Sequence, residues 1–236
     1  ILLADFGILT FSPIVLASVV GTVTMRALAQ ETTPRATLQP DLSTAESEVV
    51  QTAFRLVSAW EIGTALLLGA LCGIVAMVFI ALLDRVEGYA RHGPLVRLPA
   101  WLRPAVGGLG VGLLGVFLPR VLGVGFETVN EVLAEKLGLA LVAAVLVGKL
   151  VATALTLGTG GSGGSFSPII VVGALTGSTF GSVVHRWFPE ATGSSGAYAL
   201  LGMAALVAGA AQAPLTGMIM IFELTGDYQL ILPLMV

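Results

Sequence analysis

One glycine- and serine-rich segment contains the main candidates for a binding or catalytic site. Residues 158–168 have the sequence GTGGSGGSFSP. Three kinds of chemistry use such a segment: phosphate binding by a glycine-rich loop, acyl transfer by a serine on a tight turn, and anion binding by backbone N–H groups at a helix start. Each makes different demands on the surrounding residues.

The first possibility, a dinucleotide-binding loop, lacks its usual surroundings. Gly158, Gly160 and Gly163 satisfy the pattern G-x-G-x-x-G, but this fingerprint follows a β-strand and needs an acidic residue about 20 positions later. Here a long apolar run precedes the segment, and the next acidic residue is Glu190. No Gly-Lys-Ser/Thr follows either, so the sequence argues against nucleotide binding.

The second possibility is a serine hydrolase working inside the membrane. Residues 160–164 satisfy G-x-S-x-G, with Ser162 at the nucleophile position. A serine nucleophile needs a base within hydrogen-bond reach. The two histidines, His92 in a basic loop and His185 at a helix end, lie outside the interiors of the apolar helices. We keep hydrolysis at Ser162 as the alternative function and expect that the chain is not an enzyme.

The third possibility is an anion site at the start of a helix beginning near Ser165. The first turn of a helix presents N–H groups without partners and a partial positive charge of about half a unit. Such a site can hold an anion without a lysine and can also release it, as ion passage requires. The hydroxyls of Ser162, Ser165 and Ser167 can add donors, and the ring edge of Phe166 can narrow the pathway. A close helix contact made by the same glycines remains open as a structural explanation.

The elements that must position this segment are those of a membrane protein. Of the 236 residues, 56% are hydrophobic and 11% are charged, whereas soluble domains have about 25% charged residues. Residues 62–83, 150–184 and 191–222 contain no charge, and about 20 apolar residues cross a bilayer core. We therefore predict an all-α integral membrane protein with seven or eight helical segments, several of them too short to span alone.

The apolar runs place these helices along the chain. We predict helices over residues 11–23, 62–83, 104–118, 137–157 and 165–184, an amphipathic stretch at 125–136, and two further segments separated at 212–214. Residues 84–103 carry more basic than acidic side chains, which predicts a cytoplasmic loop and places the acidic 30–61 loop outside.

The overall charge and the cysteine usage exclude other classes of partner. The net charge of −3 leaves no basic stripe for phosphates, so nucleic acid is not an expected partner. Cys72, the single cysteine of the chain, rules out an intrachain disulfide and indicates no metal site. We expect no metal and no cofactor.

Two segments resemble a known family. Residues 158–181, GTGGSGGSFSPIIVVGALTGSTFG, resemble the G-x-F-x-P signature segment of the CLC chloride channels and proton-coupled chloride exchangers, with Gly164, Phe166 and Pro168 at its fixed positions. Residues 212–235 resemble the next segment of that family, and residues 11–20 an earlier interfacial helix. The likeness covers essentially the whole chain, residues 1–236.

The resemblance implies a fold and a function. The family fold is an inverted repeat of helices, some broken and re-entrant, whose N-termini point at a central anion, and each subunit of a homodimer has its own pathway. The implied function is transmembrane chloride transport, by a voltage-gated-type channel or a proton-coupled antiporter. The implied partners are the lipid bilayer and chloride, the transported ligand, and the implied location is the cell membrane.

The resemblance also assigns the site residues. The backbone N–H groups of Ser165 and Phe166 are expected to bind chloride. Glycines are expected to let the chain approach the ion closely, and Pro168 fits the first helical turn because its missing N–H has no role there. The glycines concerned are Gly161, Gly163 and Gly164.

Other elements of the family site have no match in this chain. These are a Gly-Ser-Gly-type loop, a Gly-Arg/Lys-Glu-Gly-Pro loop with the gating glutamate, and a late tyrosine. We expect both loops, together with the inner glutamate that exchangers of the family use for proton transfer, to lie before Ile1, and the tyrosine to lie after Val236. The chain is then expected to be a fragment, covering the end of the first half and most of the second, that does not transport alone.

Five remaining polar residues have competing interpretations. Lys149 could line an anion vestibule, but we favour a lysine that pairs or reaches an interface. Glu223 could carry protons, but an acid at a helix end fits better. Tyr228 suits an interfacial anchor. Glu127 and Glu131 share a helix face in a polar stretch and are assigned no acid/base role.

Overall fold

The computed structural model describes Val20, residues 60–93, Val96, Leu98, Pro99, residues 102–188 and residues 193–225. All regular secondary structure in these residues is helical, which confirms the all-α prediction. The chain divides into the units Ile1–Ala45 and Glu46–Val236, and every helix described below belongs to the second. The predicted helix at 11–23, apart from the helical Val20, lies outside the described residues, as do most of the 30–61 loop and Tyr228.

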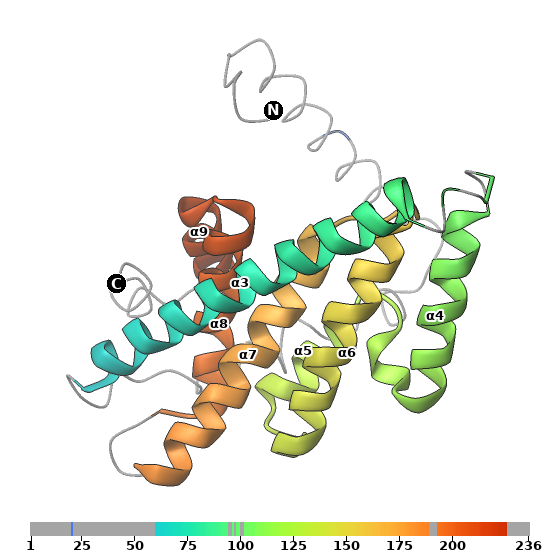
Figure 1. Cartoon of the computed structure of the whole chain (residues 1–236). Coiled ribbons are helices and arrows are strands. Elements are labelled where there is room, and N and C mark those ends of the chain that lie inside the picture. The colour runs from blue at the N-terminus through green and yellow to red at the C-terminus, as the bar shows by residue number, and fades with distance from the viewer. Residues whose placement is uncertain are drawn as a thin grey trace. The chain divides into compact units, whose positions relative to one another are not determined.

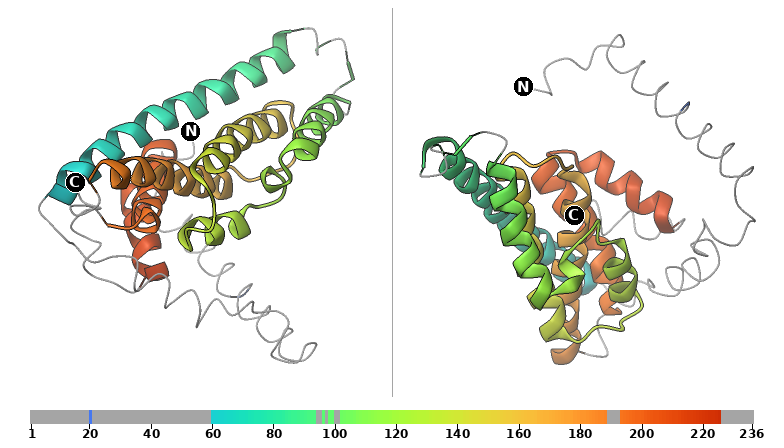
Figure 2. Two further views of the ribbon diagram at one scale, coloured as in Figure 1. Left: turned by 90° about the horizontal axis from the view of Figure 1, so that it is seen from below. Right: turned by 90° about the vertical axis from the view of Figure 1, so that its right-hand side faces the viewer.

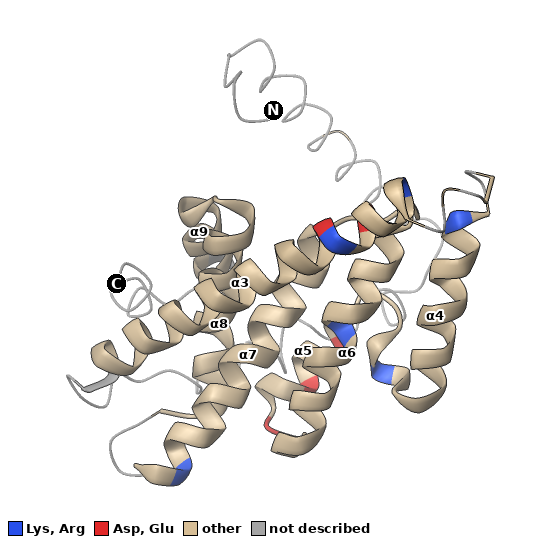
Figure 3. Cartoon of the chain, in the orientation of Figure 1, with Lys and Arg blue, Asp and Glu red and all other residues tan. Residues whose placement is uncertain are grey.

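From Trp60 onward the described residues form seven α-helices and one short 3-10 helix (Figure 1). They are α3 (Trp60–His92), α4 (Arg103–Phe117), η2 (Pro119–Val121), α5 (Phe126–Leu133), α6 (Leu139–Gly158), α7 (Phe166–Trp187), α8 (Ser195–Ala211) and α9 (Pro214–Thr225). Three of these helices, α3, α6 and α7, are long and apolar enough to cross a membrane. Charged side chains are sparse on the ribbon (Figure 3), as lipid contact requires.

Helix α3 is longer than its apolar run predicts. The run ends at Asp84, but the helix continues to His92. The side chains of Glu87 and Arg91 form an ion pair of 2.7 Å one turn apart, which supports the helix beyond the apolar part. The first part of the predicted 84–103 loop is therefore helical, and its location on the cytoplasmic side stays a prediction.

The chain breaks between α6 and α7, as the glycines predict. Gly160 has a φ of +88°, in the left-handed region that favours glycine. Its N–H donates to the carbonyl of Leu157 (3.0 Å), and the N–H of Gly161 donates to that of Thr156 (2.9 Å). This pair of bonds is the usual glycine stop of an α-helix. It ends α6 cleanly and leaves residues 161–165 to lead into α7.

Helices α7 and α8 are in backbone contact. A Cβ atom added to Gly173 of α7 would lie 2.5 Å from the carbonyl oxygen of Gly202 in α8. One added to Gly177 would lie 2.7 Å from the carbonyl carbon of Tyr198. Small residues allow this close approach between helices in lipid. The contact holds α7 firmly against α8.

Helix α3 crosses α6, α7 and α8, and α4 lies beside α6 (Figures 1 and 2). The hydroxyls of Thr64 in α3 and Tyr198 in α8 lie 2.8 Å apart and share a hydrogen bond. Further along α3, the side chains of Leu68, Cys72 and Phe79 are buried in the hydrophobic core. These contacts pack α3 against α8, which in turn packs against α7.

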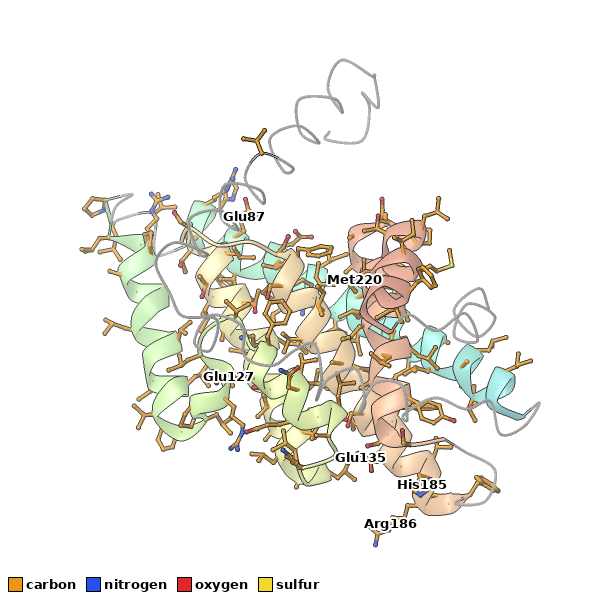
Figure 4. All side chains as sticks on the ribbon, turned by 180° about the vertical axis from the view of Figure 1, so that it is seen from behind. Glu87, Glu127, Glu135, His185, Arg186 and Met220 are labelled. Carbon is orange, nitrogen blue, oxygen red and sulfur yellow. The ribbon has the colours of Figure 1, made fainter. Side chains whose placement is uncertain are left out.

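The start of α8 is capped by a carboxylate from a distant part of the chain. Oε1 of Glu135, which follows α5, accepts the N–H of Ser195 (2.7 Å), the N–H of Gly196 (3.3 Å) and the hydroxyl of Ser195 (3.0 Å). The side-chain Oγ of Ser194 accepts a hydrogen bond from the N–H of Ala197. A negative charge at a helix N-terminus is stabilising. Figure 4 shows where Glu135 lies relative to α8.

We expect Glu135→Ala to lower the free energy of unfolding by about 1 kcal/mol, the usual value of a lost cap. Thermal unfolding of the complete protein in detergent measures this loss. Asp84→Ala is the matched control, because Asp84 is also an exposed acid but lies in the interior of α3, away from both helix ends. Equal unfolding midpoints for the two variants would contradict the role of Glu135 as a cap.

Candidate functional site

The segment that leads into α7 is open. Residues 162–166 are exposed, and the Phe166 side chain is 47% accessible. A Cβ added to Gly164 would meet nothing within 4 Å. Close helix packing is instead the role of Gly158, whose added Cβ would lie 2.7 Å from Val86 of α3. Gly164, the glycine nearest α7, thus makes no contact that a side chain would disturb.

Helix α7 begins with donors that have no acceptor among the described residues. Its first bond runs from the N–H of Ile169 to the carbonyl of Ser165 (3.1 Å). The N–H groups of Ser165, Phe166 and Ser167 reach no described acceptor, and no side chain caps this helix. Pro168 lies in the first turn, as predicted, where it has no N–H to leave unpaired. The start of α7 therefore offers donors and a partial positive charge to a bound anion.

The hydroxyl of Ser167 has an acceptor within the chain. Its Oγ donates to the carbonyl of Val124 at 3.3 Å, so it points at the loop between η2 and α5. The N–H of Gly161 donates to the carbonyl of Thr156 at the end of α6, and the close approach of this glycine to an anion stays a prediction. Gly163 lies near Leu157, whose Cδ2 would be 3.3 Å from an added Cβ.

Lys149 has an environment that neither sequence interpretation describes. Lys149 belongs to α6 and is only 3% exposed, so its side chain does not reach the boundary between membrane and water. Its Nζ donates to the carbonyls of Val121 (3.0 Å) and Gly123 (2.7 Å). No carboxylate in the described part of the chain forms an ion pair with it. Nothing in the sequence pattern could have revealed these two acceptors.

A cleft lies beside this loop. It has a volume of about 610 Å³ and is lined by residues between Pro119 and Glu131. On its wall Nε of Arg120 donates to Oε2 of Glu131 at 2.8 Å. The hydrogen bond and the charge of Glu131 raise the pKa of Arg120. Because the two charges are paired, the cleft offers an anion no free cation from this arginine.

The remaining candidates are the two histidines, considered as a base for Ser162, and Glu223, considered as a proton carrier. His185 lies in the last turn of α7, and Ser162 precedes the first, so about 30 Å of helix separates them. Figure 4 shows His185 at one end of the unit and Glu87, whose backbone adjoins Gly158, at the other. His92 is the last residue of α3. The side chain of Glu223 lies outside the described residues.

Comparisons with known proteins agree on one family. Residues 1–236 match the family model described as voltage gated chloride channel. The chain is 43% identical over 183 residues to a putative chloride channel protein ClcB-like from Ralstonia nicotianae, covering 77% of this chain and 42% of the relative. It is 36% identical over 241 residues to chloride channel protein CLC-f from Arabidopsis thaliana, covering 96% and 29%.

A third relative is named as an exchange transporter and not as a channel. The chain is 34% identical over 173 residues to the H(+)/Cl(-) exchange transporter ClcA from Salmonella agona, covering 72% of this chain and 36% of the relative. The chain therefore spans between 29% and 42% of the length of these three relatives.

Proposed function

The chain belongs to the voltage-gated chloride channel family, CLC, and on this premise we propose that it forms part of a protein that carries chloride across a membrane. The relatives include proteins named as a chloride channel and as a proton/chloride exchanger, and the proposal covers both modes. The complete protein is a homodimer in the cell membrane, with one anion pathway in each subunit.

We propose that the anion is held by backbone N–H groups at the start of α7. The observation that carries this proposal is the uncapped first turn, where Ser165 and Phe166 present N–H groups without described acceptors. No charged residue lies between positions 150 and 184, and the neighbouring Lys149 directs its ammonium at carbonyls. The site thus acts through dipoles, which bind an anion weakly enough to release it.

Chloride efflux from liposomes containing the complete protein tests this proposal. Replacing residues 163–166 with a bulky helical sequence is expected to abolish efflux, because it fills the space before α7 and covers the donors. Size-exclusion chromatography of the purified variant shows whether it remains folded. Efflux at the wild-type rate from a folded variant would contradict the proposed site.

Serine hydrolysis is the competing function, and Ser162→Ala separates it from transport. We expect chloride efflux to stay within about twofold of wild type, because this substitution removes a hydroxyl and no backbone donor. A hydrolase would lose its activity completely. An assay with a general ester substrate beside the efflux assay distinguishes the two functions.

A further inference from the structure

The buried ammonium of Lys149 needs a reason, because burying a charge is costly unless acceptors surround it. Its acceptors are the backbone carbonyls of Val121, at the end of η2, and Gly123, in the loop that follows. Lys149 lies in the interior of α6, one of the helices able to cross a membrane. The lysine therefore meets irregular backbone within a spanning helix bundle.

The loop of residues 121–125 in turn requires donors for its backbone carbonyls. Gly123 and Gly125 have φ values of +70° and +94°, and Leu122 is extended, so the backbone between η2 and α5 is irregular. Irregular backbone at membrane depth is tolerated only when its polar groups are satisfied by protein or water. The Lys149 ammonium satisfies two carbonyls of this loop, and it thereby holds residues 121–125 in one conformation.

The same loop touches the start of α7. The carbonyl of Val124 accepts the hydroxyl of Ser167, the second residue of that helix. Gly125 lies between the lysine and α7, since an added Cβ would be 3.2 Å from Nζ of Lys149 and 3.0 Å from Cγ2 of Val171. A continuous path of contacts thus runs from Lys149 through the loop to the first turn of α7.

We propose that Lys149 is a positioning residue for the anion site. It holds residues 121–125 against α7 and so fixes the direction of the N–H groups of Ser165 and Phe166. Its own charge faces carbonyls and does not bind the anion. This inference rests on the proposed function and adds to it a second element, contributed by α6 and the loop before α5.

A double-mutant cycle on chloride transport by the complete protein tests the inference. Lys149→Met removes the donors at similar volume, and Ser167→Ala removes the contact between loop and helix. We expect Lys149→Met to raise the KM for chloride about tenfold, as expected for losing one or two hydrogen bonds. Ser167→Ala should raise it about threefold, and the double variant should match Lys149→Met alone, because both changes act through the same loop.

Two further variants complete the design. Lys149→Arg keeps charged donors and is expected to restore a KM within about threefold of wild type. Thr179→Val is the control, because the Thr179 hydroxyl donates within α7 to the carbonyl of Leu175 and makes no described contact with the loop. Its KM should equal that of the wild type.

Three results would overturn the inference. They are a wild-type KM in Lys149→Met, a wild-type KM in Ser167→Ala, and effects that multiply in the double variant, which would mean that the two residues act independently. If Lys149→Met fails to fold, the KM of Ser167→Ala still decides, since this residue is only partly buried. Failure of the proposed function is distinct, because the wild-type protein itself would then carry no chloride.

Discussion

Ser165→Pro is expected to lower chloride transport by about 10- to 100-fold, because it removes one N–H donor to an anion, an interaction worth about 1.5–3 kcal/mol. The backbone tolerates the change. Ser165 has a φ of −83°, close to the value of about −65° that proline adopts, and its N–H has no described acceptor to lose. The preceding residue, Gly164, is the residue type best able to adapt to a following proline.

Ser165→Ala is the matched variant, because it removes the hydroxyl and keeps the N–H. We expect its chloride efflux to stay within about twofold of wild type, since the proposed ligand is the backbone. Thermal unfolding of both variants shows whether either has lost its fold. If both variants transport chloride at the wild-type rate, this N–H has no role. If both lose transport to the same extent, the ligand is the hydroxyl.

Gly177→Ala is expected to cost about 3 kcal/mol of stability, near the upper end of the usual penalty for overpacking. The added Cβ would collide with the carbonyl group of Tyr198, which is backbone and cannot rotate away. Helices α7 and α8 would have to separate, and the start of α7 would move with them. We therefore expect a strong loss of folded protein together with a loss of chloride transport.

Gly108→Ala in α4 is the control for this prediction. Gly108 is also a helical glycine, but an added Cβ would meet nothing within 4 Å. It is expected to be neutral or to stabilise the protein by up to about 1 kcal/mol, because alanine favours helix. The folded fraction after detergent extraction and the thermal midpoint measure both variants. Similar values would show that the contact between α7 and α8 does not depend on glycine.

The positions of the helices were predictable wherever a local sequence pattern determines where a helix begins and ends. The apolar runs predicted α6 and α7, since about 20 apolar residues cross a bilayer core, and the glycines of residues 158–164 predicted the break between them. The end of α3 was not predictable in this way. The first charges after its apolar run mark a boundary of the lipid, whereas a helix can continue into water, as α3 does to His92.

The site was predictable only in its local part. The donors of Ser165 and Phe166 follow from a helix start that the sequence itself marks. The bonds from Lys149 join it to carbonyls 26 and 28 positions away, in an irregular loop with no sequence pattern. The bonds from Glu135 to the start of α8 span 60 positions or more. Such contacts depend on how the helices pack, which periodicity does not encode.

The most direct measurement is the position of bromide, a heavier halide that scatters X-rays anomalously, in crystals of the complete protein. We expect an anomalous peak within hydrogen-bond distance of the backbone nitrogens of Ser165 and Phe166, with the ammonium of Lys149 still bound to the loop carbonyls. A peak found only elsewhere, such as beside Arg120 in the neighbouring cleft, with none at the start of α7, would contradict it.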